Sequence, residues 1–255
     1  MQITVLGCSG GIGAGRRTTA FLVDDDILID CGTGVGDLSL EAMARIRHLL
    51  ITHTHLDHIA CLPLLLDTLF SRLQSRPLVI HARADCMHII HDHIFNWQIW
   101  PDFFELPERE RPVVRFHAME PAVPIYLDGR RIDMLPVAHS VPAVGYRVER
   151  DGAAFAFSGD TTSNDGFWDA LNAHDTLDLL FVECAFPDRE QALGRQAGHY
   201  CPALLARDLT KLRHAPRVGI THLKSGEEDS VFAALQARVP GRELLRLCSG
   251  DVFTI

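Results

Sequence analysis

The sequence contains no Cys-x-x-Cys pair, although it has seven cysteines. Because their number is odd and they are scattered, we expect reduced thiols and neither a disulfide framework nor a zinc ribbon. The amino terminus also has no basic segment followed by an apolar one. No apolar run approaches the roughly 18 residues of a membrane helix. These absences predict a cytoplasmic protein that does not enter a membrane.

Basic residues are fewer than acidic ones, and the formal net charge is -9. Proteins that wrap nucleic acid usually have a basic face, so the composition counts against a long nucleic acid as partner. Of the 255 residues, 47% are hydrophobic and 22% are charged, which excludes a disordered chain. No repeat or linker divides the sequence, and we expect a single domain over residues 1–255.

Short β-like segments dominate the first half of the chain, and strands mix with helices in the second half. Turn signals at Asp24-Asp25-Asp26 and Asp151-Gly152 predict two hairpins. Three helices are expected over Asp85–Trp97, Pro202–Arg213 and Glu227–Ala237. This order predicts two sheets packed face to face with helices outside. The expected strands are Ile3–Leu6, Thr19–Val23, Ile27–Asp30, Leu49–Thr52, Leu78–His81, Val113–Phe116, Ile132–Ala138, Ala143–Glu149, Ala153–Ser158, Leu179–Glu183, Val218–Thr221, Leu244–Cys248 and Val252–Ile255.

The strongest chemical signal is a cluster of metal-ligand side chains directly after the apolar run Leu49–Ile51. The cluster holds three histidines and one aspartate within six residues: His53, His55, Asp57 and His58. His53 and His55 are two positions apart, so an extended backbone points both to one side. Asp57 and His58 can then face a second ion at about 3.5–4 Å from the first. Imidazole and carboxylate together suit zinc, manganese or iron.

Three later residues of ligand type each follow an expected strand: His139, Asp160 and His222. Loops at strand ends are where functional side chains are usually placed. A polar residue at one strand end would mean little by itself. Together with the first cluster, the three residues complete a set that is large enough for two metal ions.

These residues, in this order, resemble the metallo-β-lactamase superfamily over nearly the whole chain. The resemblance implies a four-layer αββα sandwich, an α/β (α+β) fold, with two bound divalent metal ions, zinc before manganese or iron. It implies His53, His55 and His139 on one metal, Asp57, His58 and His222 on the other, and Asp160 between them. Asp30 matches an early acidic residue of the family, which we expect to orient a ligand or the following loop.

A further pair resembles the phosphodiesterase branch of the superfamily, which includes ribonuclease Z and the class II cyclic-nucleotide phosphodiesterases. Glu183 ends an expected strand, and His199 precedes an expected helix. The resemblance implies that His199 protonates the departing oxygen while Glu183 orients it, so Asp57, Glu183 and His199 are the expected catalytic residues. A sugar alkoxide needs that proton, whereas a thiolate does not. Because His55 is kept, hydrolysis is favoured over diiron redox chemistry.

Within this branch the sequence is most similar to the class II enzymes, at His53–Ile59, Ser158–Thr161 and Thr221–Lys224. The expected reaction converts a 3′,5′-cyclic nucleotide, such as cyclic AMP or cyclic GMP, into the nucleoside 5′-monophosphate. Alternatives are an RNA 3′-processing endonuclease, an ester or thioester hydrolase, and a scaffold with a vestigial site. A complete ligand set argues against the last of these. The sequence shows no long insertion for gripping tRNA.

Several other residues were candidate contacts with competing interpretations. An aromatic group could stack a nucleobase, fill a core or form a homodimer contact. A histidine-rich stretch could hold another metal or simply face solvent. Three basic residues could neutralise a phosphate or lie on the surface. The first group is Phe95, Trp97, Trp100, Phe103 and Phe104, the second is His88, His91 and His93, and the third is Arg16, Arg17 and Lys224.

Overall fold

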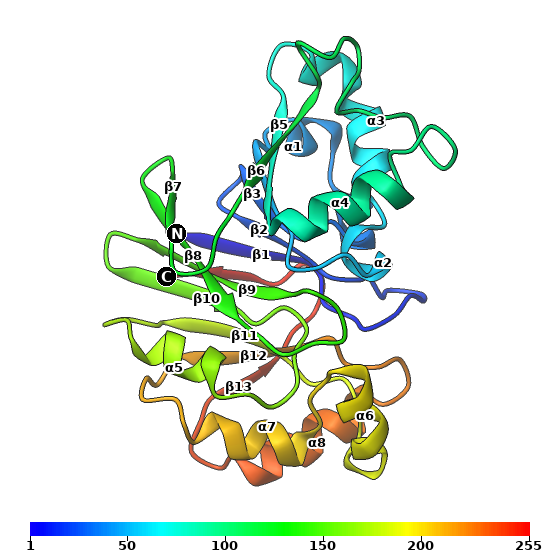
Figure 1. Cartoon of the computed structure of the whole chain (residues 1–255). Coiled ribbons are helices and arrows are strands. Elements are labelled where there is room, and N and C mark those ends of the chain that lie inside the picture. The colour runs from blue at the N-terminus through cyan, green and yellow to red at the C-terminus, as the bar shows by residue number, and fades with distance from the viewer.

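The computed structural model describes all 255 residues and consists of two seven-stranded sheets covered by helices (Figure 1). In the first sheet the spatial order is β14-β1-β2-β3-β4-β5-β6. The four strands from β14 to β3 are antiparallel, whereas β3 to β6 run parallel. The strands are β1 (Gln2–Gly7), β2 (Ala20–Val23), β3 (Ile27–Ile29), β4 (His48–Leu50), β5 (Leu78–Ala82), β6 (Val114–Ala118) and β14 (Val252–Thr254).

The second sheet has the order β13-β12-β11-β10-β9-β8-β7. Here β13 to β10 run parallel and β10 to β7 are antiparallel, which mirrors the first sheet. Strands β8, β10, β11 and β12 therefore all end at the same edge. The strands are β7 (Ile125–Leu127), β8 (Arg130–Pro136), β9 (Val144–Arg150), β10 (Ala153–Phe157), β11 (Leu179–Glu183), β12 (Arg217–Thr221) and β13 (Leu244–Arg246).

Helices cover the outer face of each sheet, so the molecule has the four layers that were predicted (Figure 1). The first sheet carries α1 (Leu40–Met43), α2 (Leu56–Ile59), α3 (Leu62–Leu73) and α4 (Ala84–His93). The second carries α5 (Gly166–Asn172), α6 (Gln191–Ala197), α7 (Pro202–Leu209) and α8 (Glu228–Arg238). Two short 3-10 turns lie at Thr33–Asp37 and Asp188–Glu190. No helix is long and apolar enough to cross a membrane.

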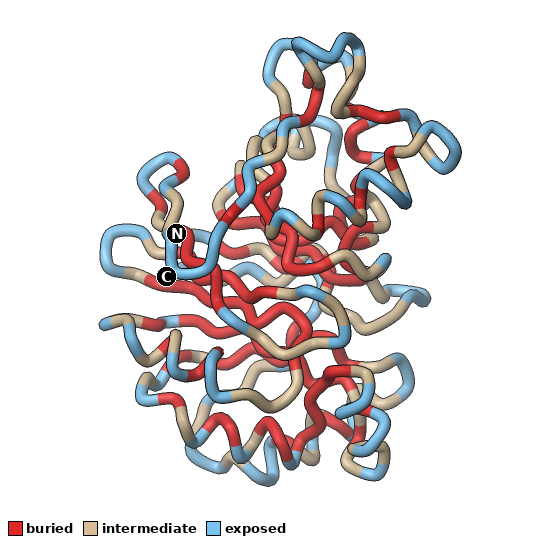
Figure 2. The backbone as a smooth tube through the Cα atoms, in the orientation of Figure 1, coloured by how far each residue is buried: buried red, intermediate tan, exposed pale blue.

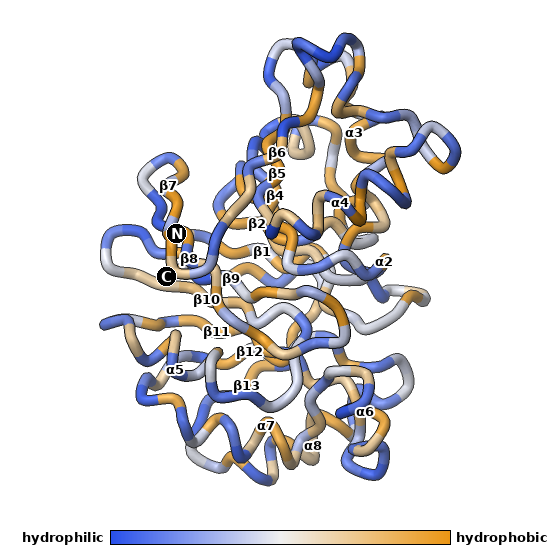
Figure 3. The backbone as a smooth tube through the Cα atoms, viewed as in Figure 1, coloured by the Kyte–Doolittle hydropathy of each residue, from blue (hydrophilic) through white to orange (hydrophobic).

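Hydrophobic side chains form three cores, one between the sheets and one beneath each helical layer. Buried and hydrophobic segments run through the central strands, while the turns are exposed and hydrophilic (Figures 2 and 3). Tyr146 spans the central core, because its hydroxyl donates to the carbonyl of Ile51 in the opposite sheet at 2.9 Å. This packing fixes the two sheets relative to each other and therefore the strand ends that meet at their shared edge.

The predicted helix over Asp85–Trp97 is too long, because α4 ends at His93. Asn96 is the cause, since its side-chain oxygen accepts hydrogen bonds from the backbone of Gln98 and Ile99 at 3.0 and 2.9 Å. Those bonds compete with helical ones. Trp97 then takes a positive φ of 63°. The hairpin turns at Asp24–Asp26 and Asp151-Gly152 lie where they were predicted.

Candidate metal centre

The seven side chains predicted as metal ligands meet at the edge where both sheets end. His53 follows β4, and His55 is the N-cap residue of α2, whose single turn carries Asp57 and His58. From the second sheet, His139 follows β8, Asp160 follows β10 and His222 follows β12. Carboxyl ends of strands are the usual place for a ligand site in sheets of this kind. The predicted residues are thus brought together from segments far apart in the sequence.

These side chains form two groups that share Asp160. One group contains His53, His55, His139 and Asp160, and the other contains Asp57, His58, Asp160 and His222. Within each group the potential ligand atoms all lie within 4.8 Å of one another. The two carboxylate oxygens of Asp160 divide between the groups. Oδ2 lies 3.6 Å from His53 Nε2 and 3.9 Å from His139 Nε2, and Oδ1 lies 3.3 Å from His58 Nε2 and 3.4 Å from His222 Nδ1.

Several of these atoms are buried and have no hydrogen-bond partner. The unpartnered atoms are His53 Nε2, His58 Nε2, Asp160 Oδ1 and His222 Nδ1. Buried polar atoms are nearly always satisfied, and an unsatisfied one is costly unless an ion or water occupies the space beside it. Four unsatisfied atoms that converge on shared points fit bound divalent cations, and a nitrogen and carboxylate donor set suits such ions.

A second layer of contacts orients the histidines so that their free nitrogens face the centre. Asp30 Oδ2 accepts from His58 Nδ1 at 2.7 Å, and Asp30 also binds the backbone and hydroxyl of Thr52, each at 2.8 Å. His139 Nδ1 donates to the carbonyl of Gly198 at 2.9 Å. A hydrogen bond of this kind fixes the tautomer and leaves Nε2 available to a metal. Asp30 therefore lies where the supporting acid was expected.

The ionisation states also suit metal binding. Burial lowers the pKa of His53 well below its ordinary value, and the nearby His58 adds to the effect. Burial would raise the pKa of the Asp160 carboxyl, but His222 and His58 outweigh it and hold this pKa well below the usual range. The neutral imidazole of His53 can bind a cation without first losing a proton, whereas Asp160 and Asp30 raise the pKa of His58 despite its burial, so a bound cation must displace the proton of His58.

Glu183 and His199 form a buried pair beside this centre. His199 Nδ1 donates to Glu183 Oε1 at 2.8 Å. The carboxylate also accepts from the backbone nitrogens of Thr161, Ala185 and Tyr200 at 3.0, 3.1 and 3.3 Å. These bonds leave Nε2 of His199 free. The ring of His199 stacks on that of His222, with centroids 5.2 Å apart and planes 17° apart.

Burial acts on the pKa values of Glu183 and His199 in opposite directions. Burial raises the pKa of Glu183, and the neighbouring His199 offsets part of this increase. Burial would lower the pKa of His199, but the Glu183 carboxylate outweighs it and raises this pKa. An imidazolium is thus stabilised next to the centre.

Sequence reasoning missed residues that hold the site without touching its centre. Gly198 has a φ of 79°, and an added Cβ would lie 2.8 Å from His139 Nδ1. Asp208 is buried and accepts from the hydroxyl of Tyr200, the residue after His199, at 2.9 Å. The glycine directly before His199 was a usable signal. The aspartate was not, because it lies near the end of α7 and belongs to no motif.

Apart from Lys224, the other candidate contacts named here lie away from the centre or are already paired. Phe95 and Phe103 are buried beneath α3 and α4, with Trp100 and Phe104 packed against the same core. These four therefore fill a core, whereas Trp97, the fifth member of the aromatic group, is 59% exposed. His91 is paired with Asp102 at 3.0 Å, and the stretch around it does not gather three potential ligands. Arg16 and Arg17 are paired with Glu228 and Asp37 at 2.6 and 2.7 Å.

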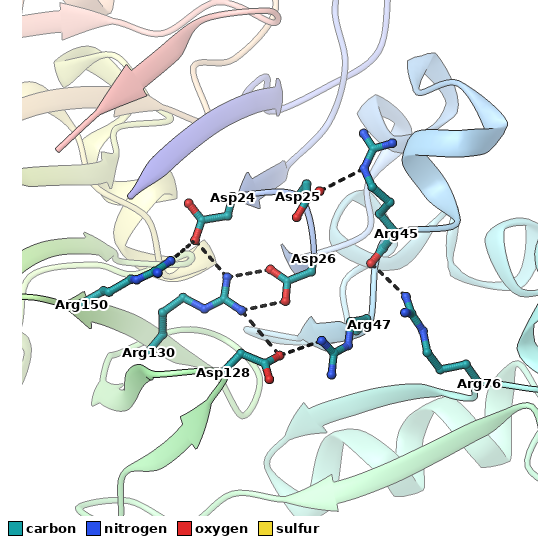
Figure 4. A pocket seen from close by; sticks show the side chains of 9 residues that line it. All are labelled: Asp24, Asp25, Asp26, Arg45, Arg47, Arg76, Asp128, Arg130 and Arg150. Carbon is teal, nitrogen blue, oxygen red and sulfur yellow. Dashed lines mark hydrogen bonds and ion pairs between the residues drawn. The ribbon is translucent and has the colours of Figure 1, made fainter.

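A strongly charged hollow of about 480 Å³ lies at the opposite end of β3 from the centre (Figure 4). Arg130 is 3% exposed and donates to Asp26 at 2.6 and 2.7 Å and to Asp24 at 3.0 Å. The contact joins the β2–β3 turn of the first sheet to β8 of the second. Because its charges are largely paired, the hollow is a structural joint between the sheets. It is lined by Asp24, Asp25, Asp26, Arg45, Arg47, Arg76, Asp128, Arg130 and Arg150.

The sequence of this chain is similar to those of a cyclic-nucleotide phosphodiesterase and a ribonuclease Z. Over 253 residues it is 24% identical to a probable 3′,5′-cyclic-nucleotide phosphodiesterase of Yersinia pestis, covering 83% of this chain and 72% of that protein. It is 27% identical to ribonuclease Z of Bradyrhizobium diazoefficiens, covering 93% and 94% of the two chains.

Solved structures share the fold over almost the entire chain. The metallo-beta-lactamase fold protein YhfI of Bacillus subtilis superposes with a TM-score of 0.78 at 22% identity, covering 99% of this chain and 98% of that one. Unliganded yeast PDE1 gives a TM-score of 0.79 at 18% identity, covering 99% of each chain.

The model of the Beta-lactamase superfamily domain matches residues 25–223. This range includes every residue of the two groups, and the fold implies binding of divalent metal. The chain therefore belongs to the beta-lactamase superfamily, and it is a metal-dependent hydrolase with the metallo-β-lactamase fold.

Proposed function

We propose that this protein is a phosphodiesterase with two divalent metal ions, zinc first among them, that converts 3′,5′-cyclic nucleotides into nucleoside 5′-monophosphates. The single observation that carries the proposal is the buried Glu183–His199 pair beside the two ligand groups. A proton donor at this place is needed for an alkoxide leaving group and is superfluous for a thiolate. The pair therefore favours phosphodiesters over thioesters.

His53, His55 and His139 would hold one ion, and Asp57, His58 and His222 the other, with Asp160 between them. When bound, divalent ions lower the pKa of water towards about 7 and stabilise negative charge on phosphoryl oxygens. The protein supplies a rigid frame for them, because four of these seven side chains follow the end of a strand within three residues, and the other three lie on or beside α2. Asp57 is the most solvent-accessible carboxylate of the centre, with 31% of its side chain exposed, which places it where substrate arrives.

His199 would transfer the proton that the leaving oxygen requires. Glu183 holds Nδ1 of His199, so the proton to be transferred is on Nε2. Because Glu183 is itself fixed by three backbone nitrogens, the imidazole keeps its orientation through the reaction. Attack of water on phosphorus, with proton donation from Nε2 to the 3′ oxygen of the sugar, would break the bond between phosphorus and that oxygen and give the 5′-monophosphate.

The similarity to a cyclic-nucleotide phosphodiesterase supports this substrate, and the similarity to ribonuclease Z supports a second candidate, cleavage of RNA. The formal net charge of -9 favours the small substrate, because RNA binding draws on a basic surface. Both reactions break a phosphodiester and both use the same proton donor.

The test is hydrolysis by zinc-loaded or manganese-loaded protein, with cyclic AMP, cyclic GMP and a 3′-extended tRNA supplied separately and products resolved by chromatography. We expect nucleoside 5′-monophosphate from a cyclic nucleotide. His199→Ala should lower kcat by about 10²–10⁴-fold and leave the metal content unchanged. The exposed His88 gives a control, since His88→Ala should retain full activity. Cleavage of the tRNA alone would replace the main proposal by the second candidate, and unchanged turnover of His199→Ala would remove His199 from the mechanism.

A further inference from the structure

Lysine is rare in this protein, which has only Lys211 and Lys224 among its 24 basic residues. Lys211 lies on the surface and is paired with Asp165 and Asp208 at 2.7 and 2.9 Å. Lys224 lies two residues after His222 and is half-buried beside the candidate centre. Lys224 therefore lies close to the candidate ligands, whereas Lys211 is held by carboxylates on the surface.

The ammonium group of Lys224 has no carboxylate within 4.0 Å. It lies over the ring of Phe186, 5.4 Å from the ring centroid. That ring in turn lies 5.6 Å from the ring of His199. By contrast, Arg16 and Arg17 are held by Glu228 and Asp37. In a chain with an excess of acids, an unpaired cation beside the expected proton donor is available to an anionic ligand.

The backbone around Lys224 is fixed on both sides. The amide of His222 donates to Cys8 at 2.8 Å, and Leu223 accepts from Gly10 at 3.1 Å. The amide of Lys224 donates to Ala185 at 3.4 Å, next to Phe186. Since these strand-end segments also carry His222 and Phe186, the lysine stem starts from a set position relative to the centre. The aromatic face then limits where its ammonium group can go.

We propose that Lys224 binds the anionic phosphate oxygens of the substrate, with Phe186 holding the ammonium group beside the centre. This inference rests on the proposed phosphodiesterase function and adds to it a residue that recognises the charge of the ester. A phosphodiester carries its negative charge before, during and after cleavage. An ammonium group that contacts it therefore contributes mainly to binding and affects KM more than kcat.

The kinetic test uses zinc-loaded protein and bis(4-nitrophenyl) phosphate. Lys224→Gln keeps most of the stem and removes the charge, and it should raise KM by about tenfold or more with kcat within about threefold. Lys224→Arg should restore most of the affinity because it restores the charge. Arg111→Gln, at a side chain that is 83% exposed and paired with Glu108, is the control and should match the wild type. Unchanged KM in Lys224→Gln, with the wild type active, would overturn the role of the lysine and leave the phosphodiesterase proposal intact.

A second experiment measures phosphate binding at Lys224 directly and does not require hydrolysis of a substrate. Reductive methylation with ¹³C-formaldehyde labels only Lys211, Lys224 and the terminal amine, and each signal can be assigned from the two Lys→Arg variants. Dimethyl phosphate, added to the zinc-loaded protein, should shift the Lys224 resonance and leave that of Lys211 in place. An unmoved Lys224 resonance at saturating ligand would contradict the proposal, and would mean that the lysine only packs on Phe186. Because this readout needs no catalysis, it decides the inference even if the diester is not hydrolysed.

Discussion

At the scale of single residues, Asp160 is the point on which the two ligand groups depend. It is 1% exposed, and its two oxygens face different sets of imidazoles. Each group has only three other members, so a change at Asp160 affects both, whereas a change at His55 or His222 affects one. The resemblance predicted Asp160 between the two metals, and in the structure this residue lies in both ligand groups. The contacts that support the histidines were harder to predict, because the hydrogen bonds of Asp30 to Thr52 and of His139 to the Gly198 carbonyl join segments far apart in the sequence.

Asp30 should control metal affinity although it does not face the centre. Asp30→Ala removes the acceptor that orients His58. It also removes the acceptor of the hydrogen bond from the backbone nitrogen of Thr52. We expect metal affinity to fall by about 10–100-fold, which is typical when a supporting carboxylate is lost. Competition with a chromogenic chelator measures the metal affinity of each protein. Asp37→Ala, which removes an exposed partner of Arg17, is the control and should bind metal like the wild type. Equal affinities of Asp30→Ala and wild type would show that His58 is oriented without Asp30.

Three histidines form a row across β4, β5 and β6, outside the candidate centre. His48 Nδ1 lies 3.0 Å from His81 Nε2, and His81 Nδ1 lies 3.3 Å from His117 Nδ1. Burial, with the neighbouring imidazoles of His48 and His117, lowers the pKa of His81 to about 3. The unfolded chain binds a proton on His81 near its ordinary pKa of about 6.5, whereas the folded chain does not.

This depressed pKa predicts a loss of stability in acid. Between pH 6.5 and 3 the unfolded state binds more protons, so the free energy of unfolding falls as the pH falls. His81→Gln should reduce this loss by on the order of 1 kcal/mol for each pH unit below 6.5. Urea unfolding of metal-free proteins at pH 7 and pH 5 measures it, with the exposed His88→Gln as control. An identical pH dependence in wild type and His81→Gln would contradict the prediction.

At the scale of elements, strand positions were easier to predict than helix limits and strand partners. The turns at Asp24–Asp26 and Asp151-Gly152 carry local signals, and both hairpins are present. Helix α3 was not predicted, because its run of leucines lacks a clear polar face and Pro63 interrupts the apolar pattern of the sequence. In the structure Pro63 lies in the first turn of the helix, where proline is favourable. The partner of β14 is β1, at the other end of the chain, and no local pattern indicates such a pairing.

The joint between the β2–β3 turn and β8 should be important for stability (Figure 4). Arg130 is buried, so Arg130→Ala leaves Asp26 without its buried partner and leaves Asp24 only its contact with Arg150, and should lower the free energy of unfolding by about 3–5 kcal/mol. Arg150 borders the same hollow, but its side chain is 47% exposed. Arg150→Ala should therefore cost about 1 kcal/mol or less. Urea unfolding compares the two variants, and equal losses would argue against a special role for the buried arginine.

At the scale of the whole molecule, the candidate centre is a product of both sheets. Four of the seven predicted ligands follow β4 in the first sheet, and three follow strands of the second. Neither sheet by itself brings a complete group together, since Asp160 of the second sheet belongs to both groups. Metal bound here would connect the two halves, and it should also stabilise the folded chain, because the unfolded chain has no preformed site. Removal of metal by a chelator should therefore lower the Tm.

The central claim is that this shared centre holds two metal ions and that both are needed for phosphodiester hydrolysis. The most direct measurement is a titration of chelator-treated protein with zinc, following bound metal by elemental analysis and hydrolysis of bis(4-nitrophenyl) phosphate in the same samples. The claim predicts that activity reaches its plateau only when about two ions are bound per chain, and that Asp160→Ala has neither tight binding nor activity. Full activity with a single bound ion, or two tightly bound ions with no hydrolysis of any phosphodiester, would contradict it.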